Sequence, residues 1–181
     1  MPRLFVAIDL PAAATTELVR IQPPPTAGVR LVEASQMHLT LHHIGETNHS
    51  QLAEVLRTVA VPIFPLVVEG VGQFRSAGDA VTMWAGVRAN ADLLALHAAV
   101  ATALATVGFQ PEFRPYNPHV ALARCEQGVP ADVVKQYLDR HALFLLPSVP
   151  IAAFGLYSSE FVSGVPVYRC ERTFPLLLPI E

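Results

Sequence analysis

The stretch MHLTLHHIG, residues 37–45, governs what can be expected of the chain, because it reads as a strand that carries several polar rings. Its leucines alternate with polar residues, as in a half-buried strand whose successive side chains point to opposite faces. Strict alternation places His38, Thr40 and His42 together on the face opposite the leucines. Because the leucine face suits a buried core, we expect the polar face to line a surface or a cleft.

A second stretch, PHVAL at residues 118–122, repeats part of this pattern 81 residues later, since 119 minus 38 is 81. His119 again precedes a small residue by two positions and a leucine by three. A lone His-x-Thr means little in a chain with 7 histidines, because short motifs recur by chance. The weight therefore rests on the repetition in two strand contexts.

A metal site is the first alternative for a strand with several histidines, because histidine is the commonest metal ligand. In an extended strand His38 and His42 lie roughly 13 Å apart, whereas a shared zinc ion needs both nitrogens within about 2.1 Å of it. A helix would bring them together, but the alternating leucines and the nearby Gly45 favour extended chain. We therefore expect no metal and no other cofactor.

Composition excludes several classes of function. With 181 residues and a net charge of -3, the chain is not expected to coat nucleic acid, because non-specific binding depends on the number of phosphates neutralised. Hydrophobic residues make up 52%, yet no run reaches the roughly 18 residues of a membrane span. The N-terminal segment does not resemble a signal peptide, and Cys125 and Cys170 form no close pair. We expect a cytoplasmic monomer with reduced cysteines and no membrane partner.

Apolar periodicity and turn residues predict interleaved strands and helices. The clearest helix begins after Asn90, which can cap it, and runs to Val107 with Gly108 at the C′ position. Short turns favour antiparallel pairing, so we predict an α+β fold. No linker divides the chain, which we expect to form a single domain over residues 1–181. The expected strands span residues 3–8, 29–32, 37–44, 62–71, 80–87, 118–124, 151–157 and 165–174, and the other helices 11–22, 50–60 and 130–140.

The motifs HLTL at 38–41 and HVAL at 119–122 resemble the paired His-x-Thr-x motifs of the 2H phosphoesterase superfamily. They are similar in particular to those of the RNA 2′,3′-cyclic phosphodiesterase family, also called the 2′-5′ RNA ligase family. Further segments agree with that family: RLFVAIDLP at 3–11, GF at 108–109, RPYNPH at 114–119 and FGLYSSE at 154–160. The resemblance implies two pseudo-twofold-related lobes of antiparallel sheet, with flanking helices around a central cleft that both motif strands face.

The resemblance also implies metal-independent hydrolysis of RNA 2′,3′-cyclic phosphodiester ends to 2′-phosphomonoesters, with RNA ends or small cyclic nucleotides as partners. Carried over onto matching positions, His38 is the proton donor to the leaving 3′ oxygen and His119 is the base that activates water. Thr40 is expected to donate to a phosphate oxygen, and His42 and Arg124 are further phosphate-binding candidates. Alternation would turn Arg124 away from the face of His119, in a supporting role. The reverse reaction would join RNA ends through a 2′-5′ bond.

The chain departs from the family pattern at Ala121, where a second threonine is expected. A methyl group cannot donate a hydrogen bond, and the loss of one donor to a developing oxyanion costs on the order of 10² to 10³ in rate. His42 is the first candidate to replace that donor. Two alternatives stay open: a phosphodiesterase for small cyclic or 2′-5′-linked nucleotides, and a non-catalytic binder of RNA ends.

The remaining histidines and aromatic residues have structural interpretations. We expect His43 to be packed and satisfied by one partner, and His97 to lie in or beside the core, on the apolar stripe of its helix. Four aromatic residues could stack on a terminal base, although core packing is the favoured role for most of them: Phe74, Phe113, Tyr116 and Tyr157.

Overall fold

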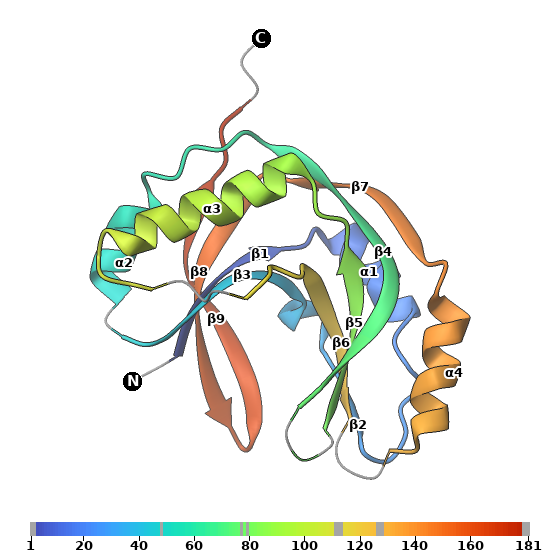
Figure 1. The fold of residues 1–181 in the computed structure, drawn as a ribbon. Helices are drawn as coiled ribbons and strands as arrows, with labels where there is room; N and C mark the ends of the chain where they lie inside the picture. Colours follow the sequence, from blue (N-terminus) through green and yellow to red (C-terminus); the bar gives the residue numbers. More distant parts are fainter. Residues whose placement is uncertain are drawn as a thin grey trace.

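The computed structural model describes residues 3–47, 49–76, 78, 80–110, 114–125 and 129–178. Strands and helices are interleaved along the chain (Figure 1). The strands are β1 Arg3–Asp9, β2 Val29–Leu31, β3 His38–Glu46, β4 Phe64–Arg75, β5 Val81–Val87, β6 His119–Cys125, β7 Leu145–Ile151, β8 Ala153–Val162 and β9 Val165–Pro175. The helices are α1 Ala12–Arg20, α2 His49–Leu56, α3 Ala91–Ala105 and α4 Ala131–His141, with a short 3-10 turn, η1, at Ala34–Gln36.

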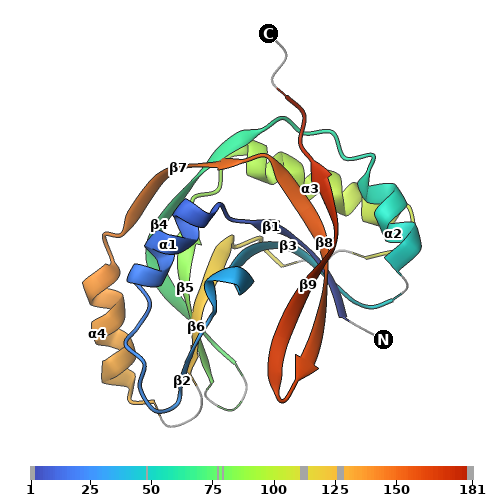
Figure 2. The same ribbon diagram turned by 180° about the vertical axis from the view of Figure 1, so that it is seen from behind.

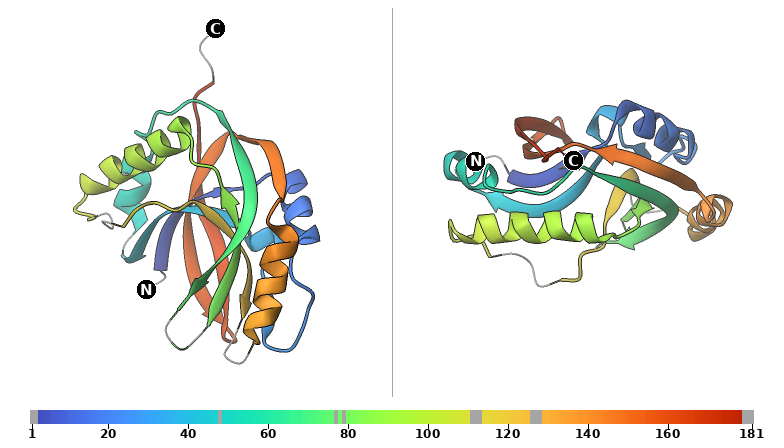
Figure 3. Two further views of the ribbon diagram at one scale, coloured as in Figure 1. Left: turned by 45° about the vertical axis from the view of Figure 1, so that its right-hand side comes forward. Right: turned by 90° about the horizontal axis from the view of Figure 1, so that it is seen from above.

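The described strands form one sheet that divides into two halves. Its order is β7-β4-β5-β6-β3-β1-β8-β9, with β2 beside β6, and the strand pairs are antiparallel. Within the described chain, β3 and β6 pair only through Leu39 and Val120, and the two halves diverge from this seam (Figures 1 and 3). Each half places its motif strand at the seam, as β3-β1-β8-β9 and β6-β5-β4-β7. This order confirms the prediction of an α+β fold with two related lobes.

The connections between strands are also repeated in the two lobes. In one lobe β1 leads through α1 to β3, and in the other β5 leads through α3 to β6. Helix α3 packs across β3 and β4 with α2 beside it, while α1 contacts β7 and η1, and α4 contacts β4 (Figure 2). The helices therefore flank the two half-sheets, as expected for α+β layering.

Helix α3 forms where the sequence predicts it. The Asn90 side chain accepts a hydrogen bond of 2.8 Å from the backbone N–H of Leu93, which is the N-cap interaction. The stripe that faces the sheet is buried, at Leu93, Leu96, Val100 and Leu104. Gly108 follows the helix with a φ of 84°, a left-handed conformation that costs glycine no Cβ clash.

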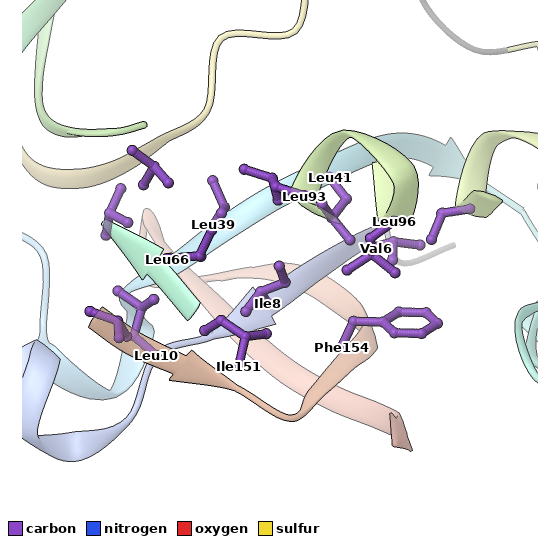
Figure 4. Packing of buried hydrophobic residues seen from close by; sticks show 14 of the residues in the cluster. Val6, Ile8, Leu10, Leu39, Leu41, Leu66, Leu93, Leu96, Ile151 and Phe154 are labelled. Carbon is purple, nitrogen blue, oxygen red and sulfur yellow. The ribbon is translucent and has the colours of Figure 1, made fainter. Parts of the chain in front are cut away.

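A single large core joins the two lobes behind the seam (Figure 4). Leu39 and Val120, the residues that pair across the seam, are both fully buried. Ile8, Leu96 and Phe154 pack into the same cluster from β1, α3 and β8. Burying one such side chain contributes roughly 1.5–3 kcal/mol, so the starts of both motif strands stand on a well-packed base.

The sheet extends beyond the expected strands at its outer parts. Strand β7 was not predicted, because Pro147 and Pro150 interrupt its pattern; it lies at the sheet edge beside β4, where proline is tolerated. The β8–β9 hairpin reaches Val162 and turns at Ser163 and Gly164, with φ of 51° and 78°.

Among the described residues, none of the helices combines the length and apolar character needed to cross a bilayer.

Candidate active site

His38 and His119 occupy the first positions of β3 and β6 and are held in the same way. Nδ1 of His38 lies 2.8 Å from the carbonyl oxygen of Gln36, and Nδ1 of His119 lies 2.8 Å from the carbonyl oxygen of Asn117. A carbonyl only accepts, so each Nδ1 carries the proton and donates it. In the neutral ring this leaves Nε2 unprotonated and able to accept a proton.

Aromatic rings hold both imidazoles from the side. The ring of His38 meets Tyr168 edge-on, with centroids 4.9 Å apart at 81°, and also contacts Phe5 at 5.0 Å. The ring of His119 meets Phe74 edge-on, with centroids 4.8 Å apart at 81°. Such edge-to-face contacts fix the orientation of each imidazole ring.

Both histidines line one cleft of about 670 Å³ between the lobes. Thr40 lines it beside His38, and Ala121 lines it beside His119, so the missing hydroxyl falls inside the cleft. Arg124 lines the same cleft. Within the described ranges, no three His, Cys, Asp or Glu side chains lie close enough together to hold a metal ion.

Burial lowers the pKa of both imidazoles below the ordinary value of 6.5. For His38 the carbonyl of Gln36 and the carboxylate of Asp9, its cross-strand partner, oppose this effect, while Arg124 adds to it. Both rings are therefore mainly neutral at pH 7 in the free protein. A bound phosphate would stabilise the imidazolium form and raise both pKa values.

Each motif strand contains a β-bulge three residues after its histidine. Along β3 the partner of Ala7 is Thr40 and the partner of Val6 is His42, so Leu41 is the extra residue. Along β6 the register passes from Ala121 to Ala123, so Leu122 is extra. A bulge places two successive residues on one side and reverses the alternation beyond it. The burial patterns of the two strands accordingly match over their first six residues.

The bulges correct three expectations from strict alternation. His42, predicted on the cleft face, is instead 7% exposed and faces the core. His43, expected to be packed, is exposed and lines the cleft. Arg124, expected to turn away from the face of His119, also lines the cleft and occupies the position in β6 that His43 occupies in β3. One extra residue per strand is the physical reason in all three cases.

Distant side chains hold the backbone at both bulges. The hydroxyl of Tyr116 donates a hydrogen bond of 3.0 Å to the carbonyl of Thr40, next to the first bulge. Nε2 of Gln22 donates bonds of 2.8 Å and 2.7 Å to the carbonyls of Leu122 and Val32, and so joins the second bulge to the end of β2. The carbonyl of Leu122 also accepts a backbone hydrogen bond of 2.9 Å from Val32 N–H, so the bonds from Tyr116 and Gln22 reinforce the backbone at or beside each bulge.

His42 belongs to a stack of rings behind the cleft. Its Nε2 lies 2.8 Å from the carbonyl oxygen of His97, and the two rings stack with centroids 4.1 Å apart. Tyr116 stacks on the other side of His97 at 4.0 Å. Burial is the main cause that lowers the pKa of His97 to about 4. His42 therefore lies behind the cleft and not among the residues that line it, where alternation placed it as a phosphate-binding candidate.

Several cleft residues were not identified from the sequence. Gln36 connects the start of β3 to β9: its carbonyl orients His38, and its Oε1 accepts a hydrogen bond of 2.8 Å from the backbone N–H of Tyr168. Arg30 and Thr82 also line the cleft. A Gln or Thr in a strand or turn carries no local signal of such a role. Their contribution depends on which strands become neighbours.

The aromatic candidates for base stacking divide by position. Phe74 lies in the cleft beside His119, so it is available to a ligand. Tyr116 is engaged with His97, and Tyr157 is buried against Phe5, as core packing predicts. Phe113 lies outside the described residues.

A sequence model of the 2′-5′ RNA ligase superfamily matches residues 10–160. The chain belongs to the 2′-5′ RNA ligase superfamily. This confirms the resemblance drawn from the two histidine motifs. The chain is 28% identical over 179 residues to an RNA 2′,3′-cyclic phosphodiesterase of Archaeoglobus fulgidus, covering 95% of this chain and 99% of the relative. It is 29% identical over 187 residues to the Escherichia coli K12 protein of the same name, covering 96% of each.

Solved structures of this superfamily share the fold. The crystal structure of E. coli LigT complexed with 3′-AMP superposes with a TM-score of 0.74 at 28% identity, covering 97% of this chain and 98% of that one. A crystal structure described as a phosphoesterase gives a TM-score of 0.75, also at 28% identity, with coverage of 97% and 98%. The two-lobed arrangement is thus common to this chain and these relatives.

Proposed function

We propose that this protein is an RNA 2′,3′-cyclic phosphodiesterase that opens the cyclic phosphate to a 2′-phosphomonoester by two-histidine acid–base catalysis. The observation that carries the proposal is the matched pair of imidazoles: each is tethered through Nδ1 to a carbonyl two residues earlier, and both line one cleft. The names of the relatives support the substrate class. The 3′-AMP complex of LigT supports a nucleotide ligand. We assign the chemistry to one domain, to which each lobe gives one motif strand.

The reaction is an in-line displacement at phosphorus. Neutral His119 accepts a proton on Nε2 from a water molecule while the water oxygen attacks. The bond from phosphorus to the 3′ oxygen breaks, and protonated His38 gives its Nε2 proton to that oxygen. The pair begins and ends with one proton, which has moved from His38 to His119, and exchange with solvent restores the starting state. Reversal of these steps would form a 2′-5′ linkage.

The phosphate oxygens need donors while charge builds on them. Thr40 offers a hydroxyl on the His38 wall, and Arg124 offers a guanidinium that matches two phosphate oxygens. On the His119 wall Ala121 offers no donor. Thr82, which pairs with Arg124 across β5 and β6, brings a hydroxyl to the same cleft.

The mechanism requires no metal, because the imidazole pair supplies both proton transfers. Since the active pair holds a single proton, its two apparent pKa values belong to the pair. Burial lowers the pKa of each ring below 6.5. We therefore expect a bell-shaped profile of kcat/KM, centred below pH 6.5, that persists in excess EDTA.

The site of action proposed is the cytoplasm, with the protein acting as a monomer. Both Cys125 and Cys170 are free thiols, which suits a reducing compartment.

A second candidate function is a non-catalytic binder of 2′-phosphate ends, favoured by the single observation that Ala121 replaces a hydroxyl inside the cleft. Such a binder would keep the arginine and threonine contacts and lose only the chemistry. A phosphodiesterase for small cyclic or 2′-5′-linked nucleotides would use the same proton transfers, so it differs from the main proposal in substrate size alone.

The test incubates an oligonucleotide that ends in a 2′,3′-cyclic phosphate with the wild type and with His38→Ala and His119→Ala, in EDTA. General acid–base catalysis contributes on the order of 10² to 10⁴, so each variant should lose at least about 100-fold in turnover. His141→Ala, outside the cleft at the end of α4, is the matched control and should keep full activity. Binding without turnover by the wild type, or a 3′-phosphate product, would contradict the proposal.

A further inference from the structure

Arg30 and Arg124 face each other across β2 and β6. They are direct cross-strand partners, and both side chains line the cleft that holds the two histidines. Like charges at directly opposed positions of an antiparallel pair destabilise the sheet. Among the described residues, neither arginine lies within 4.0 Å of a carboxylate, although Glu33 lines another part of the cleft.

The side chain of Arg124 contacts an uncharged group. Its Nη2 lies 3.5 Å from the hydroxyl of Tyr168, on the opposite lobe. Two guanidinium groups that face one cleft without a carboxylate counter-charge favour a bound anion, because an anion would offset their repulsion and take two sets of planar donors. The chain as a whole has a net charge of -3, so this pair of cations is a local feature of the cleft.

We propose that Arg30, beside Arg124, forms a second anion site, which takes the phosphate on the 5′ oxygen of the nucleoside whose 2′,3′-cyclic phosphate reacts, while Arg124 stays with the reacting phosphate. This inference rests on the proposed function. It adds a substrate feature that neither histidine motif specifies: the preferred substrate carries two phosphates, on opposite sides of one ribose.

The separation along β6 suits two phosphates. Arg124 follows His119 by five positions, one of which is the bulged Leu122, so the two Cα atoms are roughly 13 Å apart along the strand. Nη2 of Arg124 lies 3.5 Å from the hydroxyl of Tyr168, whose ring meets that of His38 edge-on, so its guanidinium lies toward the reacting centre. Arg30 lies on β2, one strand further from β5 than Arg124 on β6. We therefore assign Arg30 to the second phosphate.

The opposite wall of the cleft is apolar at the same end. Phe161, Val165 and Pro166 line it from the tip of the β8–β9 hairpin, and Phe161 is 67% exposed. The hairpin tip and β2 lie at the same end of the molecule in both ribbon views (Figures 1 and 2). A groove that combines cationic and aromatic side chains is the usual means of holding single-stranded nucleic acid. It therefore suits a nucleotide with its base attached better than free phosphate.

The experiment compares three substrates: a nucleoside 2′,3′-cyclic phosphate with a 5′ hydroxyl, the same compound with a 5′ phosphate, and a dinucleotide with an internal phosphodiester before the cyclic end. The wild type should show a kcat/KM about tenfold higher for the second and third substrates than for the first, from charge-assisted bonds to the added phosphate. In Arg30→Gln this preference ratio should fall to about 1–2, and Arg30→Lys should restore part of it.

Arg57→Gln is the matched control, because Arg57 is an exposed arginine directly after helix α2 that pairs with Glu54. It should keep the wild-type preference. The preference should also weaken with salt, and its log–log slope should fall by roughly 0.7 in Arg30→Gln if one single-strand phosphate contact is lost. A further gain for the dinucleotide over the 5′-phosphorylated mononucleotide would identify an RNA chain as the source of the phosphate, and equal values a free nucleotide.

The outcomes separate this inference from the proposed function. If the wild type hydrolyses the 5′-hydroxyl substrate but shows no preference for a 5′ phosphate, or if Arg30→Gln keeps the preference, the second anion site is wrong and the hydrolase stands. If the wild type hydrolyses none of the three substrates, the proposed function itself fails. Binding of the 5′-phosphorylated product, measured by calorimetry with the wild type and Arg30→Gln, then still decides whether the second site exists.

Discussion

Replacing Ala121 by threonine should raise the turnover of a cyclic-phosphate substrate. Ala121 is half-buried, lines the cleft, and follows His119 by two positions before the bulge. Thr40 holds the same place relative to His38 in the other lobe. A hydroxyl at position 121 would therefore give the His119 wall the donor that the His38 wall already has.

The size of the gain follows from what is missing and what already compensates. One donor to a developing oxyanion accounts for on the order of 10² to 10³ in rate when water is excluded. This cleft opens to solvent, and Thr82 and Arg124 line the same wall, so the expected gain is at or below the low end. We expect kcat to rise about tenfold, which is a barrier lower by about 1.4 kcal/mol. KM should change little, because the new bond forms mainly in the transition state.

The added atoms have room on the cleft side. Across the strands Ala121 faces Trp84, whose ring lies over Gly72 so closely that a Cβ at Gly72 would come within 2.2 Å of it. The indole of Trp84 therefore packs against Gly72, and the side chain at position 121 has space on the side of the cleft that it lines. Threonine is also a favourable residue in a strand. The variant should fold with an unchanged melting temperature.

The assay is steady-state hydrolysis of a nucleoside 2′,3′-cyclic phosphate by the wild type, Ala121→Thr and Ala121→Val. Valine has the shape of threonine without the hydroxyl, so it separates hydrogen bonding from packing. The threonine variant should exceed the valine variant by about tenfold in kcat, which is the gain expected for one donor in a cleft open to solvent. Equal kcat values for the two variants, with equal melting temperatures, would refute the reasoning and show that the His119 wall already holds a sufficient donor.

Two further predictions concern the groups behind the cleft. His97 is neutral in the folded protein because its pKa falls to about 4, against 6.5 in the unfolded chain. As the pH falls, the unfolded state therefore gains a proton before the folded state does. The free energy of unfolding should decrease between pH 6.5 and 4. Allowing for the half-exposed ring, we expect a loss of about 1–2 kcal/mol in the free energy of unfolding. Urea unfolding at pH 7 and pH 4.5 would measure this loss, which should shrink in His97→Phe. An undiminished loss in that variant would speak against His97 as its source. Gln22→Met keeps the side-chain length but removes two hydrogen bonds at the second bulge, so it should lower the free energy of unfolding by about 1–3 kcal/mol and weaken substrate binding by misaligning Arg124. A variant with reduced stability and unaltered KM would show that Gln22 does not position that arginine.

The sequence by itself determined most of the elements and their order, with β7 as the exception. Apolar periodicity and the cap at Asn90 fixed helix α3, and alternation over His38, Leu39 and Thr40 fixed the face of the first motif. The family resemblance carried by the two histidine motifs also implied two related lobes, and in the structure each motif begins a strand at the seam. These are local signals, since each depends on residues within a few positions of one another.

Only the tertiary structure decided which side chains beyond each motif reach the cleft. Alternation predicted His42 in the cleft and Arg124 turned away, and the bulges at Leu41 and Leu122 reverse both. A bulge leaves no mark in the local sequence of either strand, because side chains far along the chain bond to the backbone at or beside it. Tyr116 lies 76 positions from Thr40, and Gln22 lies 100 positions from Leu122. Strand periodicity is a local property, but the point at which it breaks depends on the partners that the fold brings to the backbone.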